Sequence, residues 1–201
     1  MLVNFIEDQW IKSLSFAQTV WLKIVCQLKG VSLGRKNRFF GLTKFTRVYK
    51  GTISIGDFCT FRSSANSNLI GINRPCMVSA IGNGEPQIII GKNCGFSGTV
   101  IGAYDRIELG DHVRCGANTL ITDGDWHEND PRAGKPRPVT IGHHVWLGVN
   151  VIVLKGVSIG ANSLIGANSV VTKDIPANVI AAGNPCIVIR ELKEHEIISP
   201  I

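Results

Sequence analysis

Residues 141–176 decide the fold, because they divide into six consecutive blocks of six: IGHHVW, LGVNVI, VLKGVS, IGANSL, IGANSV and VTKDIP. Each block begins with an aliphatic residue, and a small or β-branched residue follows four positions later in the first five. This period is neither the 3.6 residues of a helix nor the two-residue alternation of a simple strand. The first set is Ile141, Leu147, Val153, Ile159, Ile165 and Val171, and the second is Val145, Val151, Val157, Ser163 and Ser169.

A period of six fits one flat face of a three-sided prism, so three blocks make one coil of roughly 18 residues. The aliphatic residue points into the interior at each face. The Gly or Asn beside it lets the chain turn a corner, where a positive φ can be required. Successive coils pair as parallel strands and bury a continuous column of Ile, Val and Leu. Because one coil cannot bury itself, the sequence predicts several.

The same pattern continues upstream with interruptions. Further blocks start at Ile55, Ile90, Phe96, Leu109, Cys115 and Ile121. Four cysteines are spaced by 17, 18 and 21 residues, close to the coil length: Cys59, Cys76, Cys94 and Cys115. We expect them to stack above one another as small buried side chains. Disulfides between them are the less favoured interpretation.

The composition is that of a folded chain rich in strands. Of 201 residues, 44% are hydrophobic and 18% charged, which excludes a disordered chain. Ile and Val total 43 and Gly 22, while aromatic residues make up 7%, which favours short strands and tight turns over a helical bundle. No CxxC pair and no Cys/His cluster with zinc spacing occurs, so we expect no metal.

The charge is distributed unevenly. Residues 1–50 carry nine basic and two acidic side chains, whereas residues 51–201 carry twelve and thirteen. Such a basic head suits a phosphate-rich partner, a membrane surface or plain solvation. We do not expect a nucleic-acid partner, because no nucleic-acid-binding motif occurs. No secretory signal or membrane span is recognised, and unpaired cysteines favour the reducing cytoplasm.

Residues 3–28 carry apolar side chains every three to four positions, which predicts an amphipathic helix. We expect it to cap the first coil, because the end of a solenoid must be covered. Peripheral contact with the inner face of the membrane is the alternative, supported by Trp10, Trp21 and the basic head. The expected division is a helical and basic cap over 1–50, a solenoid over 51–184, and a short C-terminal helix within 185–201.

The repeat breaks between Ile121 and Ile141, which are 20 residues apart and therefore out of phase. The next inward position after Ile121 is occupied by His127. The intervening residues 122–138, TDGDWHENDPRAGKPRP, contain three prolines and two glycines and predict a loop. Excursions of this kind often carry function. The basic side chains of this loop can contact an acidic acceptor or be solvated: Arg132, Lys135 and Arg137.

The hexapeptide pattern resembles that of the left-handed parallel β-helix acyltransferases over roughly residues 50–190. The loop resembles the active-site segment of the sugar O-acetyltransferases in that family, which act on maltose, galactosides or bacterial polysaccharides. The resemblance rests on DGDWH (123–127), PVTIG (138–142), VWLG (145–148), VTKDIP (171–176) and AAGNPC (181–186). It implies an all-β, left-handed parallel β-helix, a homotrimer, and acetyl-CoA-dependent transfer to a hydroxyl of a sugar or polysaccharide precursor.

A sugar hydroxyl needs a base that removes its proton during attack on the thioester, and imidazole suits this role. The resemblance assigns it to His127. Asp125 or Asp123 can orient the imidazole, with a backbone carbonyl as the alternative, and the Gly148 amide is the candidate oxyanion donor. The candidate substrate-binding residues are Ser97, Asp123 and Trp126. The other histidines are expected at the surface: His112, His143, His144 and His195.

The resemblance also implies where acetyl-CoA binds, in a groove between neighbouring subunits and without a metal. It assigns Ala167 to the pantetheine chain and Arg190 to the phosphates. Maltose-type enzymes carry a further Arg where this chain has Ile187, so phosphate binding rests more on Lys173 and Arg190. Lys173 can also be a solvated turn residue. The full candidate set is Trp146, Gly148, Ala167, Thr172, Lys173 and Arg190.

Other functions stay open. An N-acetyltransferase of an amino-sugar nucleotide, or an antibiotic acetyltransferase of the same fold, would use much the same parts. A non-catalytic hexapeptide scaffold would bind no acetyl-CoA. A γ-class carbonic anhydrase needs three zinc-binding histidines across a subunit interface, and the adjacent His143 and His144 do not readily point into one site.

Overall fold

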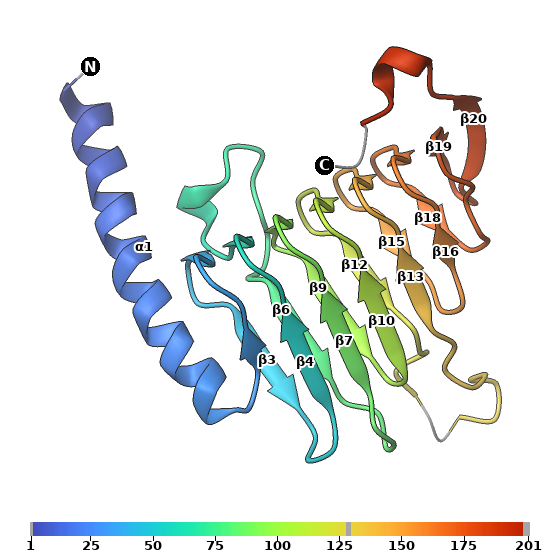
Figure 1. Ribbon diagram of the computed structural model, residues 1–201, viewed down its shortest axis with the longest axis horizontal. Helices are drawn as coiled ribbons and strands as arrows, with labels where there is room; N and C mark the ends of the chain where they lie inside the picture. The colour runs from blue at the N-terminus through green and yellow to red at the C-terminus, as the bar shows by residue number, and fades with distance from the viewer. Residues whose placement is uncertain (1, 128–129, 199–201) are drawn as a thin grey trace.

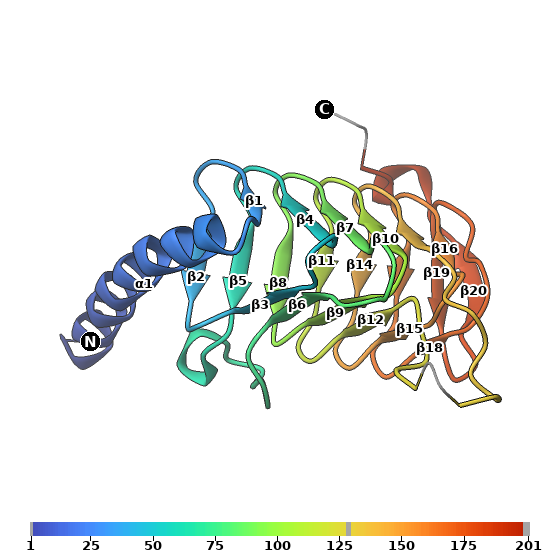
Figure 2. The same ribbon diagram turned by 90° about the horizontal axis from the view of Figure 1, so that it is seen from below.

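The structure is a computed structural model that describes residues 2–127 and 130–198, without the side chains of residues 2–9 and 12. In this part of the chain the strands form three sheets, and successive coils contribute one strand to each (Figures 1 and 2). Sheet A contains β1 (Ser32–Leu33), β4 (Thr52–Ile55), β7 (Gln87–Ile90), β10 (Arg106–Leu109), β13 (Val139–Ile141) and β16 (Ser158–Ile159).

Sheet B contains β2 (Arg38–Phe40), β5 (Thr60–Arg62), β8 (Gly95–Ser97), β11 (Arg114–Cys115), β14 (Trp146–Leu147), β17 (Leu164–Ile165), β19 (Val179–Ala182) and β20 (Ile187–Glu191). Sheet C contains β3 (Lys44–Arg47), β6 (Met77–Ala80), β9 (Val100–Ala103), β12 (Leu120–Thr122), β15 (Ile152–Val153) and β18 (Val170–Val171). The remaining elements are α1 (Leu2–Leu28) and two short 3-10 helices, η1 (Ala65–Ser67) and η2 (Glu194–Glu196).

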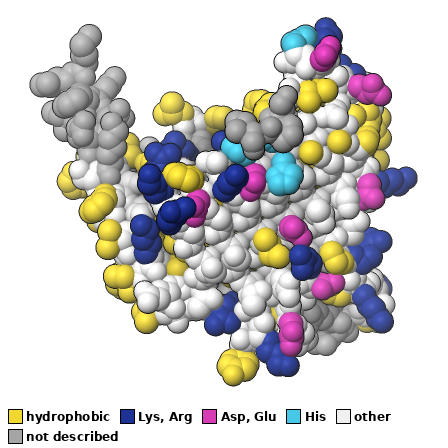
Figure 3. All heavy atoms as spheres, in the orientation of Figure 1, with side chains coloured by type: hydrophobic (Ala, Val, Ile, Leu, Met, Phe, Trp, Pro, Cys, Tyr) yellow, Lys and Arg dark blue, Asp and Glu magenta, His cyan; other side chains and the backbone are white. Residues whose placement is uncertain are grey.

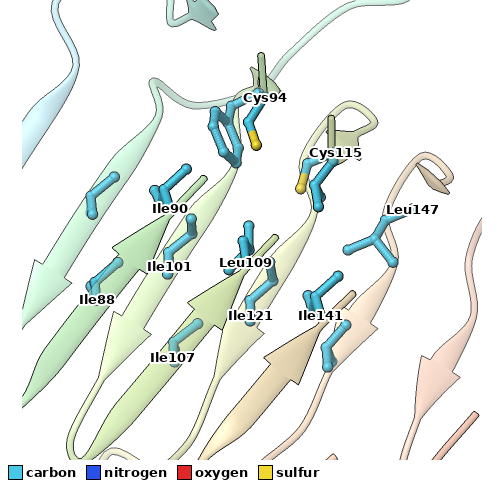
Figure 4. Packing of buried hydrophobic residues seen from close by; sticks show 14 of the residues in the cluster. Ile88, Ile90, Cys94, Ile101, Ile107, Leu109, Cys115, Ile121, Ile141 and Leu147 are labelled. Atoms are coloured by element: carbon cyan, nitrogen blue, oxygen red, sulfur yellow. The ribbon is translucent and has the colours of Figure 1, made fainter. Parts of the chain in front are cut away.

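The predicted inward residues are buried. All eleven positions of the two sets in residues 141–171 lie in the interior, and Figure 4 shows the same columns in the middle coils. In the first coils, large aromatic residues take the place of the aliphatic ones. The rings of Phe39, Phe61 and Phe96 stack at centroid distances of 5.0 and 4.8 Å. The interior is therefore one continuous apolar column.

The prediction for the corners is partly right, since positive φ occurs at Asn but not at the glycines of this pattern. The glycines that follow the aliphatic residues do not have positive φ; they allow close approach, since a Cβ at Gly142 would lie 2.6 Å from the Ala161 nitrogen. Positive φ occurs two residues later, at His144, Asn150, Asn162 and Asn168. Asn tolerates this conformation better than most residues do, which explains the GAN blocks.

The N-terminal helix is confirmed, and it packs on the edge strand β2 at the start of the prism. Thr19 Oγ1 accepts a hydrogen bond from the Phe39 amide at 3.0 Å, and Ser15 Oγ donates one to the Phe39 carbonyl at 2.9 Å. Two side chains of the helix itself, Leu22 and Cys26, are buried. The helix thereby satisfies backbone groups that an exposed edge strand would leave open to another chain.

Two boundaries differ from the prediction. The coils begin at Ser32 rather than residue 51, because β1, β2 and β3 already pair in register with β4, β5 and β6. The predicted C-terminal helix is present only as the short 3-10 helix η2, because Ile187–Glu191 instead form β20, which pairs antiparallel with β19 at the far end of the prism. The apolar, β-branched run Ile187–Ile189 favours a strand wherever a free sheet edge is present.

The predicted excursion is confirmed, since β12 ends at Thr122 and β13 begins at Val139. A second excursion, which the sequence did not predict, joins β5 to β6 and contains η1. In the described part of the chain, no helix combines the length and the low polarity needed to cross a bilayer.

All six cysteines lie in the described residues, and all are buried free thiols. The predicted single stack is only partly right. Cys59 and Cys94 are neighbours in one column, because Thr60 pairs with Gly95. Cys115 lies instead in the column of Phe96. Cys76 lies just before β6 of sheet C, beside Thr99 of the next coil. All three spacings, 17, 18 and 21 residues, therefore join different columns, and none of them corresponds to a full coil.

Candidate active site

The excursion that carries His127 begins with a buried carboxylate. Asp123 is 0% exposed, and its two oxygens accept hydrogen bonds from the amides of Tyr104 at 2.6 Å and Asp105 at 2.9 Å. Burial raises the pKa of this carboxyl, and the backbone donors oppose that effect. Asp123 thus ties β12 to the turn of the preceding coil. The substrate contact and the imidazole-orienting role predicted for it do not fit, because both oxygens are buried and engaged.

Trp126 fixes the chain one residue before His127. It has a positive φ of 64°, its Nε1 donates to Thr122 Oγ1 at 3.1 Å, and its ring meets Tyr104 edge-on at a centroid distance of 5.6 Å. The ring covers Gly102, where a Cβ would lie 2.5 Å from the indole. The indole is still 44% exposed. It can therefore both anchor the loop and contact a ligand.

His127 itself is exposed. Its carbonyl accepts a hydrogen bond from the Asp130 amide at 2.9 Å. Among the described residues, none hydrogen-bonds its imidazole. The side chain is therefore available to a ligand.

Asp125 does not orient this imidazole. Its carboxylate forms an ion pair with Lys155, in the turn after β15, and accepts a hydrogen bond from the Gly134 amide at 3.1 Å. The Lys155 ammonium lowers the pKa of Asp125. The predicted catalytic role is replaced by a structural one, because the partner of Asp125 lies thirty residues away, in the next coil.

The return of the loop is held in the same way. The Arg137 amide donates to the Asp123 carbonyl at 2.9 Å, and the Gly156 amide donates to the Arg137 carbonyl at 2.9 Å. Arg132 pairs with Asp130 at 2.7 Å. Of the three basic loop residues, Arg132 and Arg137 are thus engaged within the loop or with its neighbour, while Lys135 is exposed.

The predicted cofactor residues follow His127 along one edge of the prism. Ile121 pairs with Val153, and Val153 pairs with Val171, so Thr122 and Thr172 occupy the same position two coils apart. Two strand spacings amount to about 10 Å. Thr172 and Lys173 are exposed there. The structure thus brings the His127 loop and the Thr172–Lys173 turn to the same edge, where sheet C leads into sheet A.

Gly148 and Ala167 lie at the other edge of sheet C. They are packed closely, since a Cβ at Gly148 would lie 2.7 Å from the Ala167 nitrogen. The Gly148 amide donates to the Ile165 carbonyl at 2.8 Å. It is therefore engaged in the ladder and does not suit the predicted oxyanion role. The next amide, that of Val149, donates to none of the described residues.

Arg190 is exposed on β20 and already paired. Its guanidinium forms two hydrogen bonds of 2.7 Å with Glu196 of η2. The pairing lowers the pKa of Glu196 to about 2. A phosphate that uses Arg190 therefore competes with this carboxylate.

Ser97 and Trp146 lie elsewhere, on the outer face of sheet B. Both line a hollow of about 880 Å³ that runs across β2, β5, β8, β11 and β14. This hollow and the His127 edge belong to different sides of the same chain. Among the described residues, no group of three His, Cys, Asp or Glu side chains has a metal-binding arrangement.

Known proteins with similar sequences and folds are acetyltransferases. Residues 138–173 match the family model described as the hexapeptide repeat of succinyl-transferase. The galactoside O-acetyltransferase of Escherichia coli K12 is 43% identical over 116 residues, which are 55% of this chain and 57% of that protein. The chain thus matches little more than half the length of this curated relative.

Two solved structures extend the comparison to the fold. A galactoside acetyltransferase in complex with coenzyme A is 28% identical with a TM-score of 0.51, covering 82% of this chain and 66% of that one. A hexapeptide-repeat acetyltransferase from Vibrio cholerae, 23% identical with a TM-score of 0.55, covers 96% and 90% and supports the fold alone. The chain therefore has the left-handed parallel β-helix fold of the hexapeptide-repeat acetyltransferases, and the resemblance of its sequence to the sugar O-acetyltransferases is confirmed.

Proposed function

We propose that this chain transfers an acetyl group from acetyl-CoA to a hydroxyl of a sugar or polysaccharide precursor, with His127 as the general base. One observation carries the proposal. The exposed imidazole of His127 stands where the hexapeptide prism is interrupted, on the same edge as the exposed Thr172 and Lys173. The similarity to galactoside O-acetyltransferases supports a sugar acceptor.

The chemistry asks little more of the chain. The imidazole takes the proton of the acceptor hydroxyl while the hydroxyl oxygen attacks the thioester carbonyl. The tetrahedral intermediate collapses, the C–S bond breaks, and the imidazolium returns its proton to the departing thiolate of coenzyme A. We assign the oxyanion donor to the Val149 amide in place of Gly148, because Gly148 donates within the ladder.

Acetyl-CoA needs an extended groove with a few cations. We assign its pantetheine chain to the Gly148–Ala167 corner, where Ala167 is exposed, and its phosphates to Lys173 and Arg190. Arg190 becomes available when a phosphate displaces Glu196. The solved galactoside acetyltransferase with bound coenzyme A supports this choice of cofactor.

We further propose that the site is shared between copies in a homotrimer. Trp146 and Ser97 lie on the outer face of sheet B, whereas His127 lies on the opposite edge of the prism. A second copy packed against that face brings the two sets together. Refolding a mixture of His127→Ala and Trp146→Ala tests this arrangement.

Peripheral membrane contact in the cytoplasm is a separate proposal, based on the outer side of α1. Figure 3 shows hydrophobic side chains along the outer side of this helix. Trp10 is 70% exposed, and the other exposed hydrophobic residues of the helix are Leu14, Phe16, Val20, Trp21, Ile24 and Leu28. An amphipathic helix with basic neighbours binds anionic bilayers. Sedimentation with phosphatidylglycerol vesicles should deplete the protein, and Trp21→Ser should reduce this depletion. Equal sedimentation of both proteins would contradict it.

The transferase proposal is tested by thiol release from acetyl-CoA over a panel of sugars, glycosides, amino sugars and glycans. Wild-type protein should release thiol only with an acceptor, and His127→Ala should lower turnover by about 10²–10⁴-fold. The exposed His195 supplies the matched control, and His195→Ala should retain turnover. Release with amino sugars alone would favour an N-acetyltransferase, and no binding of acetyl-CoA would favour a scaffold.

A further inference from the structure

The hollow on the outer face of sheet B has a regular floor. Arg38, Thr60, Gly95, Arg114 and Trp146 are successive partners in the parallel register, so their side chains form one outward row. With strands about 4.8 Å apart, Arg38 and Arg114 are separated by about 14 Å. Thr60 and Gly95 between them are small, and this leaves a depression with a cation at each side.

More cations surround the same depression. Arg62 occupies the neighbouring outward row beside Ser97, and Lys36 lies at the corner that leads into β2. The Arg114 side chain leans across the floor, since a Cβ at Gly95 would lie 3.3 Å from its Cδ. Its guanidinium donates to the Asn93 carbonyl. The cations of the hollow are therefore directed at a shared space.

These cations have no counter-charge. Among the described residues, no Asp or Glu lines the hollow, and none of its four cations takes part in an ion pair. Arg38 reaches only Thr60 Oγ1, at 3.4 Å, whereas Arg62 donates a hydrogen bond to the neutral Ser67 carbonyl and lies 4.9 Å from the Phe40 ring centre. By contrast Arg35, the neighbour of Lys36, pairs with Asp57 at 3.2 Å.

Four like charges around one depression repel one another, and a bound anion relieves that repulsion. Arginine is well suited to carboxylate and phosphate, which accept its paired N–H groups. A volume of about 880 Å³ is that of a small-molecule site, so the ligand is a short segment rather than an extended polymer face.

The remaining lining suits a saccharide. Trp146 is 56% exposed at one end of the row, and Phe58 is exposed at the rim. Aromatic faces stack on the apolar C–H side of a sugar ring. Thr60, Ser97 and Asn93 add hydroxyl and amide groups for sugar hydroxyls. Cations, aromatic faces and neutral polar groups thus converge in one hollow.

We propose that this hollow binds the acceptor of the reaction, and that the acceptor is an anionic saccharide carrying a carboxylate or phosphate group held by Arg38, Arg62 and Arg114. The inference rests on the proposed acetyl transfer, and it adds the substrate class. Lys36 contributes to the field at the rim. The neutral sugar ring lies against Trp146, with Ser97 beneath it.

The test uses pairs of acceptors in which one member carries an anionic group that the other lacks. Oligogalacturonate is compared with its methyl ester, and galactose 6-phosphate with galactose, so that the two arms separate carboxylate from phosphate. For wild-type protein, kcat/KM for at least one anion should exceed that of its neutral partner by tenfold or more. Preference for the neutral partner in both pairs would overturn the inference.

Arginine variants locate the effect. Arg114→Gln and Arg38→Gln should each raise KM for the anionic acceptor about tenfold and leave KM for acetyl-CoA unchanged. Arg35→Gln, just outside the hollow, is the matched control and should leave both values unchanged. Because Arg38 and Arg114 make few side-chain contacts, equal thermal unfolding of all variants checks the fold. A raised KM for acetyl-CoA in the two hollow variants would assign the hollow to the donor instead.

Calorimetric titration with oligogalacturonate and galactose 6-phosphate separates this inference from the proposed reaction. If an anion binds, Arg114→Gln weakens that binding, and no acceptor is acetylated, the anionic site is supported and the transferase proposal is overturned. Acetyl transfer to neutral sugars, without binding of either anion, would keep the transferase and overturn the site.

Discussion

The His127 loop and the outer face of sheet B differ in how their charged groups are paired. In the loop, Asp123, Asp125 and Asp130 each hold hydrogen bonds or an ion pair, and the imidazole of His127 stands apart from them. On sheet B, four cations line a hollow without a described carboxylate partner. Paired charges hold the shape of the chain, whereas exposed charges without partners are available to ligands. This difference separates positioning residues from candidate binding residues.

The largest effect on stability is expected at Asp123. Asp123→Ala removes the carboxylate that accepts hydrogen bonds from the amides of Tyr104 and Asp105, so the free energy of unfolding should fall by about 3 kcal/mol. Acetyl transfer should fall with it, since the loop loses its first anchor. Denaturant unfolding measures the change. Asp123→Asn keeps one acceptor and should lose less; unchanged stability in Asp123→Ala would contradict the anchoring role.

Trp126 should affect turnover more than stability. Trp126→Ala removes the hydrogen bond to Thr122 and the packing on Gly102 and Tyr104, so His127 loses its fixed position. We expect kcat to fall about tenfold or more, as small displacements in an active site are costly. Trp126→Phe retains an aromatic ring and should fall less. Steady-state kinetics with saturating acetyl-CoA measure kcat for both variants. An equal loss of kcat in the two variants would contradict positioning of His127 by the ring.

The Asp125–Lys155 pair provides the pH dependence. The pKa of Asp125 is lowered in the folded chain, so its stabilisation is present above the unfolded pKa of about 4 and is lost as pH falls below it. The contribution is less than about 1 kcal/mol, because solvent screens the pair. Wild type should therefore lose slightly more stability than Asp125→Asn between pH 7 and pH 3. Parallel pH curves would contradict this.

The smallest effect is expected at Glu196. Its pKa of about 2 keeps it ionised and paired with Arg190 at neutral pH. Glu196→Gln should free Arg190 and tighten coenzyme A binding about two- to threefold. Binding of dephospho-coenzyme A, titrated in parallel, shows whether the 3′-phosphate is the group involved. Weaker coenzyme A binding in Glu196→Gln would contradict competition at Arg190.

The sequence predicts the regular part of the fold and little of its exceptions. Blocks such as IGANSL show their inward residues directly, so Ile159 and Ser163 are found buried where expected. The first coil was missed because Phe39 and Phe45 fill its interior, and aromatic residues do not match the aliphatic-Gly pattern. The C-terminal strand was missed because it depends on the free edge of β19, which no local pattern reveals.

In the candidate site, too, local features could be predicted and contacts between coils could not. The position of His127 in a loop outside the prism could be predicted, because a break in phase is visible along the chain. The partners of Asp123 and Asp125 could not, because they come from coils 18 to 30 residues away and depend on how coils stack. The hollow was missed for the same reason: Arg38 and Arg114 are 76 positions apart, and they share one row through the register of sheet B.

In the proposed homotrimer, the His127 edge of one copy and sheet B of another form one active site. Refolding a mixture of two variants, His127→Ala and Trp146→Ala, each of low activity alone, tests this arrangement. In a shared site, some interfaces of the mixed oligomers pair an intact His127 with an intact Trp146. We therefore predict that the mixture regains a substantial part of the acetyl transfer of wild type. A mixture no more active than the two variants measured separately would contradict the shared site.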